Sequence, residues 1–152
     1  MALPNIFDQA IAGTFIQRIH SLQPDSEARW GRMNAAQMMA HLNVMFELAL
    51  ENKHERPPVF VRWMMQRLIK RKLTGEAPYT RNSRTAPVMV IRHQPDFAIE
   101  QKRLLEYLAL ILAHGRTYFD LREHPAFGKM TDTEWNNLFY KHIDHHLQQF
   151  DR

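Results

Sequence analysis

The sequence TDTEWNNLFYKHIDHHLQQF, residues 131 to 150, indicates the architecture of the whole chain. Thr131 is followed three residues later by Glu134, the spacing of a capping box, in which each side chain binds a backbone N–H group that has no partner in the first helical turn. A helix is therefore expected to begin here. Apolar and histidine side chains then recur at steps of three and four residues, the period of one helix face. This face carries Trp135, Leu138, Phe139, His142, Ile143, His146 and Gln149.

Two histidines, His142 and His146, lie in this otherwise apolar face. A separation of four residues places them on successive turns, where their ring nitrogens can converge on one divalent ion. His145 is rotated by about 100° from His146 and is expected to point sideways and to be exposed. A pair of half-buried, hydrogen-bonded histidines would give the same spacing, so a metal site requires a third ligand that faces inward.

The composition limits the kinds of protein that the chain can be. Its 152 residues fit one domain spanning residues 1–152. Cysteine is absent, which excludes disulfides and thiolate ligands and leaves His, Asp, Glu and water to hold a metal. The sequence has no basic leader followed by a long apolar run, and no stretch reaches the roughly 18 apolar residues of a membrane span. We therefore expect a soluble, cytoplasmic protein with no membrane partner.

The formal charge of +4 is concentrated in one segment, residues 61 to 84. The basic residues there are Arg62, Arg67, Lys70, Arg71, Lys72, Arg81 and Arg84, against the single acid Glu76. Such a run would suit a nucleic acid or an anionic membrane surface, although a solvated helix face is commoner. No DNA-binding motif or aromatic platform accompanies it, so nucleic acid is not expected as a partner.

Three further long amphipathic segments precede residue 131. They are expected to form helices over Asn5 to Leu22, Asn34 to Asn52 and Phe97 to Gly115. Four long helices without convincing strand alternation predict an all-α protein, a four-helix bundle.

Between the second and third long helices the sequence predicts a short extra helix and a long crossover. Val59 to Leu73 has the pattern of a basic amphipathic helix whose apolar residues face something apolar. The crossover, Glu76 to Pro95, contains Val88 to Ile91 as a short apolar run that could be extended, and a loop of this length could cover a site. The connection from Arg116 to Met130 has no regular period.

His41 is the candidate third ligand. It follows a second capping signature, Asn34 with Gln37, and it occupies the inward face of the second helix among apolar neighbours. Together with His142 and His146 it would form a three-histidine site with an open coordination position, which suits Zn²⁺ or Ni²⁺.

Other polar residues are candidates for supporting roles. Gln37 and Asp144 are candidates to hold the outer ring nitrogens of the ligands. His124, in the sequence HPAFG, could form a structural turn or the rim of a pocket. The methionines at 33, 38, 39 and 45 are expected to fill the core, and the sequence identifies no catalytic acid or base.

Four motifs carry a resemblance to a known family: WGRMNAAQMMAHL at residues 30–42, HPAFGKMT at 124–131, EW at 134–135 and YKHIDHH at 140–146. In this order they resemble the DinB/YfiT-like superfamily, and more narrowly an uncharacterised branch of DinB-like metalloproteins. The resemblance covers nearly the whole chain. It implies a four-helix bundle in which one histidine of the second helix and an HxxxH pair of the fourth hold a metal, here His41, His142 and His146.

The resemblance also implies a class of reaction. Family members of known activity are metal-dependent transferases that join a low-molecular-weight thiol to an electrophile, or related hydrolases and isomerases. We therefore expect a metal-dependent thiol S-transferase, in which arginines of residues 62–84 could hold the carboxylates of the thiol. The alternative is a noncatalytic, stress-associated protein with structural histidines that binds a nucleic acid or a protein. A homodimer through the extra helix is also expected.

Overall fold

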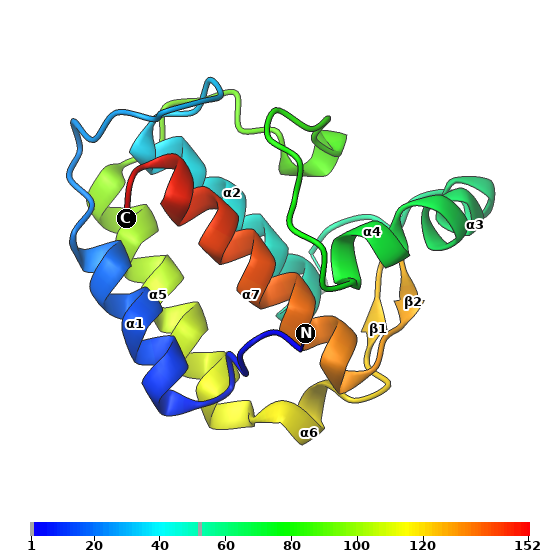
Figure 1. Cartoon of the computed structure of the whole chain (residues 1–152). Coiled ribbons are helices and arrows are strands. Elements are labelled where there is room, and N and C mark those ends of the chain that lie inside the picture. Colours follow the sequence, from blue (N-terminus) through cyan, green and yellow to red (C-terminus); the bar gives the residue numbers. More distant parts are fainter. Residues whose placement is uncertain (1, 52) are drawn as a thin grey trace.

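Four long helices form a bundle in the computed structural model, which describes residues 2–51 and 53–152 (Figure 1). They are α1 (Gln9–His20), α2 (Ala35–Leu50), α5 (Phe97–His114) and α7 (Asp132–Gln149). Helices α2 and α1 each pack against both α5 and α7. The all-α architecture predicted from the sequence is therefore confirmed.

The smaller elements lie between the long helices. They are α3 (Val59–Leu68), α4 (Lys70–Thr74), the 3₁₀ helix η1 (Pro87–Met89), α6 (Arg116–Phe119), β1 (Glu123–His124) and β2 (Gly128–Lys129). The two strands pair antiparallel, with Glu123 opposite Lys129. The apolar run at 88–91 thus contains part of a 3₁₀ turn, and the connection 116–130 contains a helical turn and a hairpin. Strands of two residues are too short to show an alternating pattern in the sequence.

Side chains at the helix starts set where each helix begins. The capping boxes at Asn34 and Thr131 are both formed, and α2 and α7 begin at the next residue. Helix α1 begins at Gln9 rather than at Asn5, because the Asp8 carboxylate accepts hydrogen bonds from two backbone N–H groups of the first turn.

The predicted helix ends differ by a few residues from those observed. Helix α2 ends at Leu50, and Asn52, where we expected its end, lies outside the described residues. Helix α5 ends at His114, and Gly115 follows with φ of +71°, a conformation that glycine adopts without strain. The basic helix expected over 59–73 is divided at Ile69, whose φ of −109° departs from helical values, and α4 continues to Thr74.

The core is built around aromatic rings from several helices. Phe139 of α7 lies 5.3 Å from both Phe46 and Phe119 and 5.4 Å from Trp135, measured between ring centroids. All four side chains are almost completely buried. The predicted inward face of α7 is buried too, except His142, which is partly buried. Met38, Met39 and Met45 fill the core as expected.

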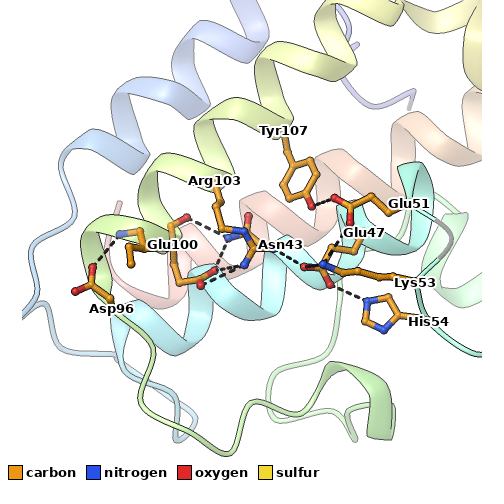
Figure 2. A network of polar contacts seen from close by, with 10 residues as sticks. Asn43, Glu47, Glu51, Lys53, His54, Asp96, Glu100, Arg103 and Tyr107 are labelled. Atoms are coloured by element: carbon orange, nitrogen blue, oxygen red, sulfur yellow. Dashed lines mark hydrogen bonds and ion pairs between the residues drawn. The ribbon is translucent and has the colours of Figure 1, made fainter.

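A network of charged side chains also joins α2 to α5 (Figure 2). Arg103 of α5 pairs with Glu47 of α2 and lies 2.9 Å from the Glu100 carboxylate. Asn43 of α2 donates to that same carboxylate at 2.8 Å. Burial raises the pKa of Glu47, but hydrogen bonds from Lys53, His54 and Arg103 outweigh this effect and leave the pKa below its ordinary value. Glu47 is therefore ionised and held inside the interface.

Candidate metal centre

The ring of His41 on α2 is held by the crossover. Its Nδ1 atom lies 2.8 Å from the backbone carbonyl oxygen of Met89, at the end of η1. A carbonyl can only accept, so Nδ1 carries the proton and, in the neutral ring, Nε2 keeps its lone pair. The crossover therefore contacts the site through Met89, and this contact fixes the tautomer of His41.

His146 on α7 is fixed in the same way by a different partner. Its Nδ1 atom lies 2.9 Å from the side-chain oxygen Oε1 of Gln149, one turn further along α7. The amide nitrogen of Gln149 donates to the Trp30 carbonyl at 2.5 Å, which determines which end of the amide faces His146. Nδ1 of His146 therefore carries the proton, and its Nε2 atom keeps a lone pair.

His142 completes the cluster. Its Nε2 atom lies 2.9 Å from Nε2 of His41, and one ring nitrogen from each of the three histidines lies within 4.8 Å of the other two. In a tetrahedral site with metal–nitrogen bonds of about 2.0–2.1 Å, ligand nitrogens are about 3.3 Å apart. Small side-chain movements would reach that spacing, so this cluster could hold a metal ion.

The environment keeps all three rings neutral at physiological pH. Burial lowers the pKa of His41, and the bond to the Met89 carbonyl offsets only part of that effect. Burial also lowers the pKa of His146 to about 3, and burial together with the neighbouring histidines places that of His142 well below its ordinary value. Neutral imidazoles are the form in which histidine binds metals.

The same geometry also has a metal-free explanation. Because His41 keeps a lone pair on Nε2, its 2.9 Å contact with His142 would be a hydrogen bond if His142 carried its proton on Nε2. The three rings would then form a structural, hydrogen-bonded group. The two explanations differ in one respect that can be measured, namely whether the cluster takes up a metal.

The residues that hold the outer ring nitrogens are not those predicted. Asp144 forms an ion pair with Arg18 at 2.7 Å, and Gln37 closes the capping box of α2 and donates to the carbonyl of His93. Instead, the Met89 carbonyl holds Nδ1 of His41, and the Gln149 side chain holds Nδ1 of His146. Gln149 could have been found from the sequence, because it lies three residues after His146 on the same helix face.

His145 is not exposed, contrary to the prediction. It is partly buried, and its ring packs edge-on against Trp30 and Tyr79, with centroids 5.8 and 5.7 Å away. Burial lowers its pKa, and the nearby positive charge of Arg81 adds to this effect. His145 therefore belongs to the wall around the cluster.

A cavity of about 350 Å³ lies next to this wall. It is lined by Arg29, Trp30, Arg81, Gln148, Asp151 and Arg152. The guanidinium group of Arg81 lies 4.0 Å above the Trp30 ring, a cation–π contact that holds the arginine at the cavity. Arg29 pairs with Asp151, and the remaining charges of the lining, Arg81 and Arg152, make it cationic.

His124 has a structural role. Its Nδ1 atom faces the backbone N–H groups of Ala126 and Phe127 at 3.1 and 3.3 Å, so it holds the turn between β1 and β2. Its ring stacks on that of Phe127 and is buried, which lowers its pKa to about 4. Of the two roles that the sequence allowed for His124, a structural turn or the rim of a pocket, the structure shows the turn.

Replacing Gln149 with alanine is expected to weaken metal binding by about 10- to 100-fold, the usual cost of losing a residue that orients a ligand. The His146 ring would lose the acceptor that fixes its tautomer. Competition with a fluorescent chelator measures the affinity. Gln148→Ala is the matched control, because Gln148 is the exposed neighbour of Gln149, and it should bind metal like the parent. Equal affinities in the two variants would contradict the role given to Gln149.

Comparison with known proteins gives one match. A family model described as a protein of unknown function, DUF1569, matches residues 8–152, which include all three histidines of the cluster. No curated protein and no solved structure matches the chain. The family match does not test the resemblance to the DinB/YfiT-like superfamily, which stays a prediction.

Proposed function

We propose that this chain, which belongs to the DUF1569 family, binds one divalent metal ion through His41, His142 and His146 and is a metal-dependent enzyme. The observation that carries the proposal is the fixed tautomer of two ligands. Met89 and Gln149 each hold an Nδ1–H group on the outer side of a ring, so both Nε2 lone pairs are available to one ion.

The donor set narrows the choice of metal. Three neutral imidazoles are ligands of intermediate softness, which suit Zn²⁺ and Ni²⁺ better than Mg²⁺ or Ca²⁺. Three protein ligands also leave a coordination position for a substrate or water, as in catalytic sites. Such an ion would supply Lewis-acid chemistry, lowering the pKa of a thiol or a water molecule that reaches it.

The reaction that we propose is transfer of a low-molecular-weight thiol to an electrophilic carbon. A carbon–sulfur bond forms, the leaving group departs with the electron pair of the broken bond, and the thiol proton passes to solvent. The resemblance in sequence motivates this choice, and hydrolysis by the same site is the nearest variant. Met89 and Gln149 would orient His41 and His146. The wall of Trp30, Tyr79 and His145 would keep bulk water from one side of the site.

The cationic cavity supports a thiol that carries carboxylate groups. Of the arginines between 62 and 84, Arg81 is the one that lines this cavity, together with Arg152, while Arg29 in the same lining is already paired with Asp151. Guanidinium groups bind carboxylates through paired, charge-assisted hydrogen bonds. Trp30 connects the cavity to the cluster, because it also contacts His145 and provides the carbonyl that fixes Gln149.

The test is a thioether-forming assay with zinc-loaded or nickel-loaded protein and an alkyl halide as the electrophile. We expect faster product formation with glutathione, which carries carboxylates, than with 2-mercaptoethanol, which carries none. Arg81→Gln should raise the KM for glutathione about tenfold and leave the KM for 2-mercaptoethanol unchanged. The tenfold change corresponds to the loss of one charge-assisted hydrogen bond at an exposed site. No rate above background with any thiol, in a protein that does hold metal, would contradict the transferase.

A noncatalytic protein with structural histidines is the second candidate, and the 2.9 Å contact between His41 and His142 supports it. In that case the cluster would contribute to stability through a chain of hydrogen bonds. Nitrogen NMR of the metal-free protein would then show His142 protonated on Nε2, and titration with Zn²⁺ or Ni²⁺ would leave the spectrum unchanged.

A further inference from the structure

Helix α3 exposes large apolar side chains on one face. Val59 is 80% exposed, Phe60 71%, Leu68 68% and Trp63 55%. We expected this face to pack on an apolar surface, yet Figure 1 shows α3 projecting away from the four long helices. Soluble proteins rarely gather so many apolar residues on one exposed face unless that face binds something.

The opposite side of α3 and α4 packs against the rest of the protein. Met65 packs against the core, and Gln66 lies beside Gly128 of the hairpin. Lys70 donates to the carbonyl of Lys129 at 2.9 Å and pairs with Glu134 at 3.0 Å. The apolar face is thus presented by a segment that is held in place on its inner side.

The same segment carries a concentrated positive charge. Residues 57–75 contain Arg62, Arg67, Lys70, Arg71 and Lys72 and no acidic residue. Arg67, Arg71 and Lys72 are exposed. At 100° per residue, Arg67 falls between Phe60 and Trp63 around the axis of α3, so positive charge and apolar surface occupy the same face.

We propose that α3 and α4 bind to an anionic membrane surface, with Phe60, Trp63 and Leu68 inserted among the lipids and the exposed basic residues on the headgroups. Helices that lie in the plane of a membrane interface combine exposed Trp, Phe and Leu with Lys and Arg, and a long side chain such as Arg67 can extend from the apolar face to the headgroups. No described helix is long and apolar enough to cross a membrane, so the contact would be peripheral.

Charge complementarity favours lipid over a second copy of the chain. A twofold pairing of this face would bring the exposed Arg67, Arg71 and Lys72 of two copies into one interface, and residues 57–75 contain no acidic residue to balance them. Anionic headgroups supply the opposite charge that such a surface needs. The proposal is independent of the metal centre, since none of its residues contacts the histidine cluster in the interactions described above.

Co-sedimentation of the full-length protein with lipid vesicles tests the proposal. We expect binding to vesicles of equimolar phosphatidylcholine and phosphatidylglycerol, and little binding to phosphatidylcholine alone. The emission should shift to the blue on binding, because Trp63 is exposed, whereas Trp135 is buried and Trp30 is partly buried against His145. In Trp63→Phe the spectral shift should disappear while sedimentation with the vesicles persists.

Two variants separate the apolar and the electrostatic contributions. Phe60→Ser with Leu68→Ser should weaken binding about a hundredfold or more through lost insertion, and Arg67→Gln with Arg71→Gln and Lys72→Gln about a hundredfold through lost charge. The matched control is Ile99→Ser with Leu110→Ser, two exposed apolar residues of α5. It should bind like the parent.

Three outcomes would overturn the proposal. The first is equal binding to neutral and anionic vesicles. The second is a parent protein that does not bind vesicles and sediments as a dimer, while the Phe60→Ser, Leu68→Ser variant sediments as a monomer. The third is a protein that does not bind vesicles but binds an oligonucleotide in a salt-sensitive way, with the same affinity in the parent and in the Phe60→Ser, Leu68→Ser variant.

Discussion

Addition of Zn²⁺ to the metal-free protein is expected to raise the midpoint of thermal unfolding by about 10 °C, and His142→Ala is expected to abolish the increase. A ligand that binds the folded state alone, present at about 1,000 times its dissociation constant, adds about 4 kcal/mol of stability. In a chain of this length each kcal/mol corresponds to about 2–4 °C. Circular dichroism melts with zinc and with a chelator measure the difference.

His20→Ala is the matched control for this experiment. His20 is exposed at the end of α1, away from the cluster, so its removal should leave the zinc-dependent increase intact. The His142→Ala protein should still unfold cooperatively, because the apolar side chains of the inward face of α7 remain in the core. An undiminished increase in His142→Ala would place the zinc elsewhere on the protein.

Arg103→Met is expected to destabilise the bundle by about 2–3 kcal/mol. Removing one partner from a buried charge network leaves the remaining charges unpaired, which usually costs more than the loss of an exposed ion pair. Arg103 pairs with Glu47 and Glu100, whose side chains are 7% and 10% exposed. About a third of the Arg103 side chain is exposed, so we place the cost below that of a fully buried pair. Urea unfolding followed by circular dichroism gives the change.

Lys102→Met provides the comparison on the same helix. Lys102 is 78% exposed and its partner Glu106 is similarly solvated, so this substitution should change stability by less than about 0.5 kcal/mol. Equal effects of the two substitutions would mean that the network in Figure 2 contributes little to the α2–α5 interface. The metal affinity of Arg103→Met should match that of the parent, since Asn43 and Glu47 point to a different side of α2 from His41.

The bundle and the histidine cluster could be predicted because both follow from local rules. The capping boxes at Asn34 and Thr131 fixed two helix starts, and the inward face of α7 followed from spacing alone. His41, His142 and His146 share one property visible in the sequence, namely that each is polar at an inward position of an apolar helix face. The helix period therefore sufficed to bring them together.

The remaining features depend on contacts between distant segments. Nothing near Met89 in the sequence indicates that its carbonyl faces His41, 48 residues earlier in the chain. The sequence shows Gln149 one turn after His146, but not the Trp30 carbonyl that orients its amide, because Trp30 lies 119 residues away. The exposure of Phe60 and Trp63 could not be predicted either, because an amphipathic pattern does not say whether its apolar face meets the core or solvent.

Metal content is the measurement that tests the central claim most directly. Untagged protein, purified without added metal, is analysed by plasma mass spectrometry beside the His41→Ala variant, and both are then titrated with Zn²⁺ and Ni²⁺. We predict close to one equivalent of zinc or nickel in the parent and its loss in the variant. A parent that contains no metal and takes up none on titration would contradict the metal centre and leave the hydrogen-bonded histidine cluster as its replacement.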